Sequence, residues 1–192
     1  PAAPTPISAP GGPAFDSFVL TLDESDAVRL AVEDAKNFPH EVARLRPTAN
    51  VKVSLGYEIV GAPPLVHVCE QKGGGDLKKA ALLLLAGADI NGTDFHRCTP
   101  LHWATMRGKV DHVRLLLAWG GADLNAIGGD HTPLYYAVNS GHVEIVRLLL
   151  LGGADANRRS FLSCYYRTPL QSAIDKGHVE IERLLREAGA VE

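Results

Sequence analysis

The hexapeptide Thr99-Pro100-Leu101-His102-Trp103-Ala104 has two close copies further along the chain. They begin at Thr132 and Thr168, and a weaker copy begins at Pro63. The proline at the second place of each copy stands at position 64, 100, 133 or 169, so successive copies lie 36, 33 and 36 residues apart. Self-similarity at such a period predicts a stack of equivalent structural units instead of one globular core.

Each strong copy predicts a pair of short helices. Its threonine can cap a helix with the side-chain oxygen, and the proline suits the first helical position. The glycine nine residues after the threonine tolerates the left-handed backbone that ends a helix. An apolar block with helical spacing follows, and a Gly-Ala-Asp-x-Asn turn then closes the unit. The helix-ending glycines are Gly108, Gly141 and Gly177, and the turns end at Asn91, Asn125 and Asn157.

These motifs resemble the ankyrin repeat family over about two thirds of the chain, from Pro63 to the C-terminus. The resemblance implies an all-α solenoid of helix-turn-helix units joined by β-turn or hairpin loops, with about five repeats. The first repeat is degenerate, with helices expected around residues 26–34 and 41–45. The competing interpretation is a separate helix and strand packed on the end of the array. The predicted segments are a Pro/Gly-rich flexible tail or linker (1–20) and an ankyrin repeat domain (21–192), divided at 21–52, 53–91, 92–125, 126–157 and 158–192.

The composition excludes several classes of protein. The chain has 192 residues, and its 19 Lys+Arg and 22 Asp+Glu give a net charge of −3, which provides no bulk attraction to nucleic acid or anionic lipid. The longest apolar run, Ala80–Ala86, is far shorter than the roughly 18 residues that a membrane span needs. Three cysteines do not make a disulfide framework. We therefore expect an intracellular, monomeric protein, cytoplasmic or nuclear, without direct nucleic-acid binding or membrane insertion.

The residues that could carry chemistry are few. His96, Cys98 and His102 lie close together in the sequence, but they contain no Cys-x-x-Cys pair of the kind that binds zinc. The family resemblance also gives His102 a structural role. No histidine and acid follow a cysteine at a spacing typical of a catalytic nucleophile. We therefore predict no catalytic residue, metal or cofactor. The alternative of an enzyme would use Cys164 or the His96, Cys98 and His102 group.

In the ankyrin family, partners usually lie against a concave face built from turn tips and the exposed side of the first helices. The resemblance thus implies a non-catalytic interaction module for a protein partner. Two alternatives are an accessory or regulatory domain of a larger enzyme or regulator, of which this chain is a fragment, and a structural spacer or self-associating array. The long turn Arg158–Arg167 is rich in aromatics and arginines, the side chains most enriched at interface hot spots. By position, the predicted partner-binding residues are Phe95, His96, Met106, Arg107, His131, Asn139, Ser140, Phe161, Tyr165, Tyr166, Arg167, Asp175 and Lys176.

Overall fold

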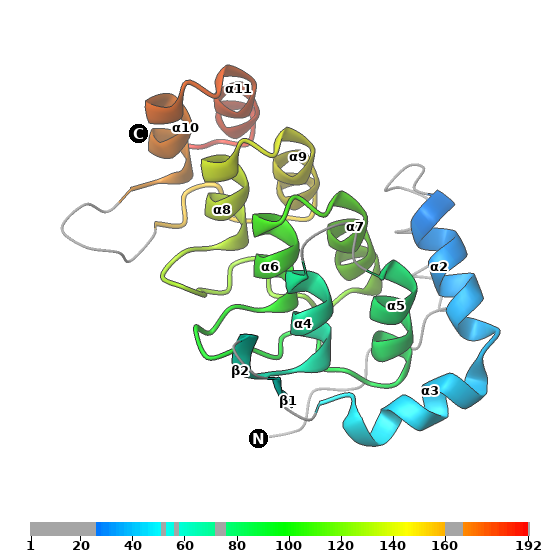
Figure 1. Ribbon diagram of the computed structural model, residues 1–192. Coiled ribbons are helices and arrows are strands. Elements are labelled where there is room, and N and C mark those ends of the chain that lie inside the picture. The colour runs from blue at the N-terminus through cyan, green and yellow to red at the C-terminus, as the bar shows by residue number, and fades with distance from the viewer. Residues whose placement is uncertain (1–25, 51–52, 56–57, 72–75, 160–166, 192) are drawn as a thin grey trace, which may run out of the picture.

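The computed structural model describes residues 26–50, 53–55, 58–71, 76–159 and 167–191. Helices account for most of this part of the chain, together with one short hairpin (Figure 1). The elements are α2 (Asp26–Lys36), α3 (Pro39–Leu45), a 3-10 turn (Arg46–Thr48), β1 (Val53–Leu55), β2 (Glu58–Ala62), α4 (Pro64–Glu70), α5 (Leu77–Leu85), α6 (Pro100–Met106), α7 (Val110–Trp119), α8 (Pro133–Ser140), α9 (Val143–Leu151), α10 (Pro169–Lys176) and α11 (Val179–Glu187).

The helices from α4 onward form two rows. The first helices α4, α6, α8 and α10 pack side by side, and the second helices α5, α7, α9 and α11 form a parallel row behind them (Figure 1). The core lies between the rows. It consists largely of Leu, Val, Ala and Ile side chains, which form one thin layer in each repeat. The predicted helical solenoid is therefore confirmed. Its fully buried side chains include Leu65, Leu83, Leu101, Leu116, Leu134, Leu149, Leu170 and Leu185.

The predicted caps begin three of the first helices. Thr99, Thr132 and Thr168 each accept a hydrogen bond on the side-chain oxygen from the backbone N–H three residues later. At the other end of α8, Gly141 has a φ of 74° and ends the helix in the left-handed conformation that glycine adopts without a Cβ clash. Both signals act within one helix, which explains why the sequence predicts them well.

A row of asparagines joins each repeat to the next. The side-chain amide of Asn91 donates to Gly121 O (2.7 Å), and its Oδ1 accepts from Asp123 N (2.8 Å). Asn50 makes the same two bonds to Gly87 O (3.0 Å) and Asp89 N (2.6 Å). Asn157 continues the row to Gly189 O (3.1 Å) and Val191 N (2.9 Å). Asn50 thus occupies the same place in the first turn as Asn91 does in the next.

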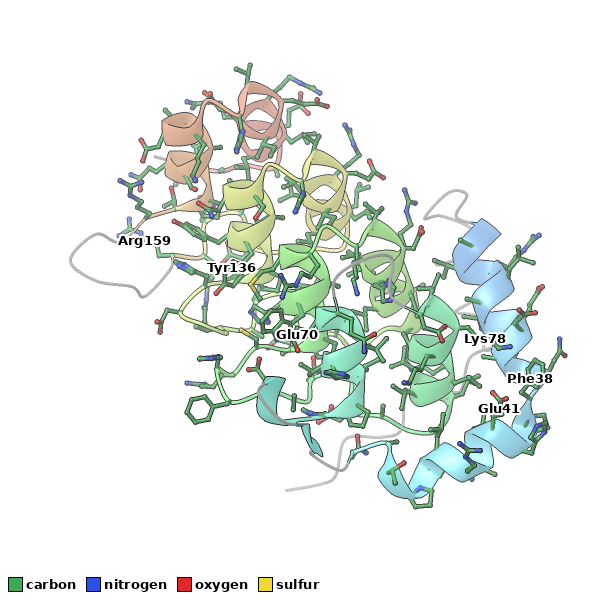
Figure 2. All side chains as sticks on the ribbon, in the orientation of Figure 1. Phe38, Glu41, Glu70, Lys78, Tyr136 and Arg159 are labelled. Atoms are coloured by element: carbon green, nitrogen blue, oxygen red, sulfur yellow. The ribbon has the colours of Figure 1, made fainter. Side chains whose placement is uncertain are left out.

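The N-terminal helices depart from the two-row arrangement. Helix α3 packs on α5, as a second helix should, but α2 lies along α5 and α7 instead of joining the row of first helices beside α4 (Figure 1). Its apolar face, with Val28, Val32 and Ala35, is buried there. Lys78 of α5 places its Nζ 4.0 Å from the ring centroid of Phe38, between α2 and α3 (Figure 2). The antiparallel strands β1 and β2 then lead into α4, with Leu55 opposite Glu58.

Cys69, Thr105 and Val138 occupy equivalent positions in the first helices α4, α6 and α8, and Thr105 allows a prediction about stability. Thr105 and Val138 each lie six residues after the capping threonine, and both are fully buried. Thr105 Oγ1 has no hydrogen-bond partner within the described ranges. A buried hydroxyl without a partner costs about 1–3 kcal/mol. Replacing Thr105 with valine should therefore raise the free energy of unfolding by about 1 kcal/mol in urea denaturation, and Thr105→Ala, which removes the methyl as well, should not.

Candidate functional site

Loops lead into the first helices α6, α8 and α10, and the first two of these loops project from the same side of the array (Figure 1). We call them the finger loops. They comprise residues 92–99, residues 126–132 and, before α10, the described residues 158–159 and 167–168. The finger loops and the exposed side of the first helices together form the finger face.

Asp94 organises the first finger loop. Its side chain is only 4% exposed, and its Oδ1 accepts hydrogen bonds from the backbone N–H groups of His96 (2.8 Å) and Cys98 (2.8 Å). Its Oδ2 accepts from the indole Nε1 of Trp103 (2.7 Å), on helix α6. A carboxylate that holds both its own loop and the following helix fixes the loop in one conformation. This places Phe95 at the tip with 81% of its side chain exposed.

The second finger loop is bonded to the first. Gly129 N donates to His96 O (2.9 Å) across the gap between the two loops. Tyr136, at the start of α8, donates its hydroxyl to Gly128 O (3.2 Å) or Gly129 O (3.1 Å) from beneath the loop (Figure 2). A side chain at Gly128 would place its Cβ 2.7 Å from Arg97 O, so this close approach requires glycine. The two loops therefore form one rigid unit.

His131 carries the aromatic surface from the second loop onto α8. Its ring stacks on Tyr135 with a centroid distance of 4.2 Å and an interplanar angle of 4°. It also meets the ring of Tyr136 edge-on at 5.2 Å. On the first loop, the rings of Phe95 and His96 make a comparable edge contact at 5.4 Å. Aromatic side chains of this kind offer a large contact area at a low cost in conformational entropy.

His102 is a structural residue and not a ligand. It is fully buried, its Nδ1 accepts from Thr99 N (3.1 Å), and its Nε2 faces the carbonyl oxygens of Ala126 (3.2 Å) and His131 (3.1 Å). Because both partners of Nε2 are acceptors, this nitrogen carries the proton of the neutral ring. Burial lowers the pKa of His102 from 6.5 to about 4, against the opposing effect of the carbonyls. Both ring nitrogens are occupied, so neither is available to a metal.

The thiols of Cys69 and Cys98 are also unsuited to chemistry. Both are buried, and burial raises the pKa of each to about 12. A thiol with such a pKa stays protonated at neutral pH and is a poor nucleophile or metal ligand. Within the described ranges no three His, Cys, Asp or Glu side chains are grouped as a metal site requires. Cys164 lies outside the described residues.

The predicted partner-binding residues fall into two groups at opposite ends of the first helices. Phe95, His96 and His131 lie on finger loops, whereas Met106, Arg107, Asn139, Ser140, Asp175 and Lys176 lie at or next to the C-terminal ends of α6, α8 and α10. Helix α6 has seven residues, so the two groups lie about 10 Å apart along its axis. Arg167, before α10, reaches Asp175 at its far end in an ion pair of 2.6 Å. Phe161, Tyr165 and Tyr166 lie outside the described residues.

The tertiary structure adds residues that sequence reasoning missed. Asp94 and Trp103 hold the first finger loop, although neither was among the predicted site residues. Arg107 places its guanidinium carbon 5.3 Å from the ring centroid of Trp103 and donates from Nε to Glu70 O (2.9 Å) at the end of α4. Arg97 is exposed at the tip beside Phe95. The spacing of Asp94 from Trp103, nine residues, contains no recognisable signal for this bond.

The comparison with known families agrees with this architecture. A family model described as ankyrin repeats matches three overlapping stretches, residues 26–128, 65–160 and 127–191. The chain belongs to the ankyrin repeat family. Ankyrin repeats are generally modules for protein–protein interaction. The matched stretches include the finger loops 92–99 and 126–132 and the start of α2. None of the described ankyrin helices has the length and apolar character to cross a membrane.

Two curated relatives carry the same repeats. The chain is 44% identical over 52 residues to the putative ankyrin repeat protein FPV244 of Fowlpox virus (strain NVSL), a match that covers 27% of this chain and 8% of the relative. It is 37% identical over 65 residues to ankyrin repeat protein OPG189 of Vaccinia virus (strain Copenhagen), covering 33% and 11%. The matched part of this chain thus spans about a tenth of the length of each relative, which makes the likeness one of repeats and not of whole proteins.

Proposed function

We propose that this ankyrin repeat domain is a non-catalytic module that binds a protein partner through its finger face. The observation that carries the proposal is Phe95, a large apolar side chain exposed at the tip of a loop held by the buried Asp94 carboxylate. Exposed apolar side chains on a fixed scaffold are typical of interaction surfaces. A loop that is ordered before binding loses little conformational entropy in the complex.

Three further features support this proposal. The two described cysteines are free and buried, as expected of a protein from a reducing, intracellular compartment. His102, which lies close to His96 and Cys98 in the sequence and was therefore a candidate metal ligand, instead makes hydrogen bonds that stabilise the fold. The two finger loops are joined through Gly129 and His96, so a partner would meet a continuous surface with little need for rearrangement.

Removing the side chain of Phe95 should weaken partner binding without unfolding the domain. We expect Phe95→Ala to reduce capture of a partner from the source cell by about tenfold or more, as measured by quantitative mass spectrometry. The melting temperature should remain within about 2 °C of the parent value, since an exposed side chain contributes little to stability.

Leu151→Ala is the matched control for this experiment. Leu151 is 74% exposed but lies at the end of the second helix α9, away from the finger face. Its replacement removes a similar exposed apolar group and should leave the captured proteins unchanged. Equal loss of partners in both variants, or loss with Leu151→Ala alone, would contradict binding through the finger face.

A further inference from the structure

We propose that the finger face recognises an acidic segment of a protein partner, with an apolar side chain of that segment packed against Phe95. This inference rests on the proposed function and specifies the chemistry of the partner. It follows from a difference between the arginines on the two sides of the array.

The arginines on the second helices α7, α9 and α11 are neutralised by the protein itself. Helices α7, α9 and α11 contain four arginines, and α5 contains none. Each of the four has a carboxylate within ion-pair distance, either on the same helix or on the next repeat. The pairs are Arg114–Glu144 (2.6 Å), Arg147–Glu180 (3.2 Å), Arg183–Glu187 (2.6 Å) and Arg186–Glu182 (3.0 Å).

Four arginines on the finger face are not neutralised in this way by any residue that the structure describes. Arg97, Arg107, Arg158 and Arg159 are all exposed, and no carboxylate within the described ranges forms an ion pair with any of them. Arg159 lies on the side of the array from which the finger loops project, as Tyr136 and its loop do (Figure 2). Arg167 differs, because Asp175 pairs with it. Among the described residues, the finger face therefore presents four guanidinium groups that have no carboxylate partner, on a chain whose net charge is −3.

The guanidinium group of Arg107 is held in place before any partner arrives, and Arg97 starts from a fixed backbone. Arg97 has a φ of 62°, and its N–H donates to Asp94 O (3.1 Å), so its backbone is fixed within the first finger loop. Arg107 is fixed by Glu70 O and the face of Trp103, while its two Nη groups bind nothing among the described residues. A positioned guanidinium with free N–H groups suits a carboxylate, which it can bind through two parallel hydrogen bonds.

The surface favours a protein over a nucleic acid. Phe95 is 81% exposed and offers an apolar contact that a phosphate backbone cannot use. Nucleic-acid binding depends on many phosphate contacts and on an electropositive domain. An acidic peptide segment with one large apolar side chain satisfies both the arginines and Phe95.

Selection from a random peptide library displayed on phage tests the chemistry of the partner without assuming its identity. The enriched peptides should be rich in Asp and Glu and contain a large apolar residue. Synthetic copies should lose at least tenfold in affinity when Lys replaces their acidic residues, and affinity should fall with rising salt. The triple variant R97E/R158E/R159E should reduce their binding at least tenfold, and Phe95→Ala should do the same.

The variant K36E/R44E/R46E is the matched control, because it reverses three exposed cations outside the finger face and changes the net charge equally. It should retain binding. Neutral or basic peptides whose binding still depends on Phe95 would overturn the acidic preference but leave the proposed function intact. Peptides that bind independently of Phe95 and of the finger arginines would overturn both. A single-stranded RNA that bound more tightly than the selected peptides at physiological salt would also overturn the proposal.

Discussion

Replacing His102 with alanine should lower the free energy of unfolding by about 3 kcal/mol or more. The imidazole is fully buried and connects Thr99, at the start of α6, to the Ala126 and His131 carbonyl oxygens of the second finger loop. Each buried backbone group left without a partner costs about 1–3 kcal/mol, and the lost ring leaves a cavity in addition. Urea denaturation followed by circular dichroism measures the change.

The last repeat provides the matched variant for this experiment. Gln171 occupies the place of His102 there, and its Oε1 accepts from Thr168 N (3.1 Å) as His102 Nδ1 accepts from Thr99 N. His102→Gln should therefore keep the cap and lose only the bonds to the second finger loop. Its free energy of unfolding should lie between that of the parent and that of His102→Ala. A loss below about 1 kcal/mol for His102→Ala would show that the histidine does not join the two repeats.

Acidification from pH 7 to pH 4 should destabilise the domain by several kcal/mol. Burial lowers the pKa of both His102 and His112 from 6.5 to about 4, so the unfolded chain binds protons in this range that the folded chain does not. Stability is therefore fully present above pH 6.5 and is lost as the pH falls toward 4. At pH 4 each histidine accounts for roughly 3 kcal/mol by linkage. Urea denaturation at a series of pH values measures this loss.

His112→Ile separates the contribution of one histidine from the rest. His112 is 2% exposed, its Nε2 has no partner within the described ranges, and Ile145 and Ile181 fill the equivalent positions in the next two repeats. The variant should be more stable than the parent at pH 7 and should lose less stability on acidification. An unchanged dependence on pH would mean that His112 is protonated equally in the folded and unfolded chains.

Much of this fold was predictable because its signals are local. Thr99, Thr132 and Thr168 cap their helices within three residues, and Gly141 ends α8 at the residue where it stands. A repeated local pattern also fixes the stacking, because each copy presents the same faces to the next. The position of α2 was not predictable in this way. Its apolar spacing predicts a buried face, but that face fits against α5 and α7 as well as against a first helix.

The residues of the candidate site also differ in whether local sequence signals could predict their roles. Motif and period alone predicted a solenoid with Phe95, His131 and Arg167 in its turns, because both depend only on neighbours along the chain. The packing of the repeats was needed to show that Asp94 holds Trp103, that Arg167 pairs with Asp175, and that no described carboxylate pairs with Arg97. Ion pairs and buried hydrogen bonds depend on distances between residues remote in sequence or on opposite ends of a helix. Composition and spacing do not specify those distances, because they are set by how the repeats pack against one another.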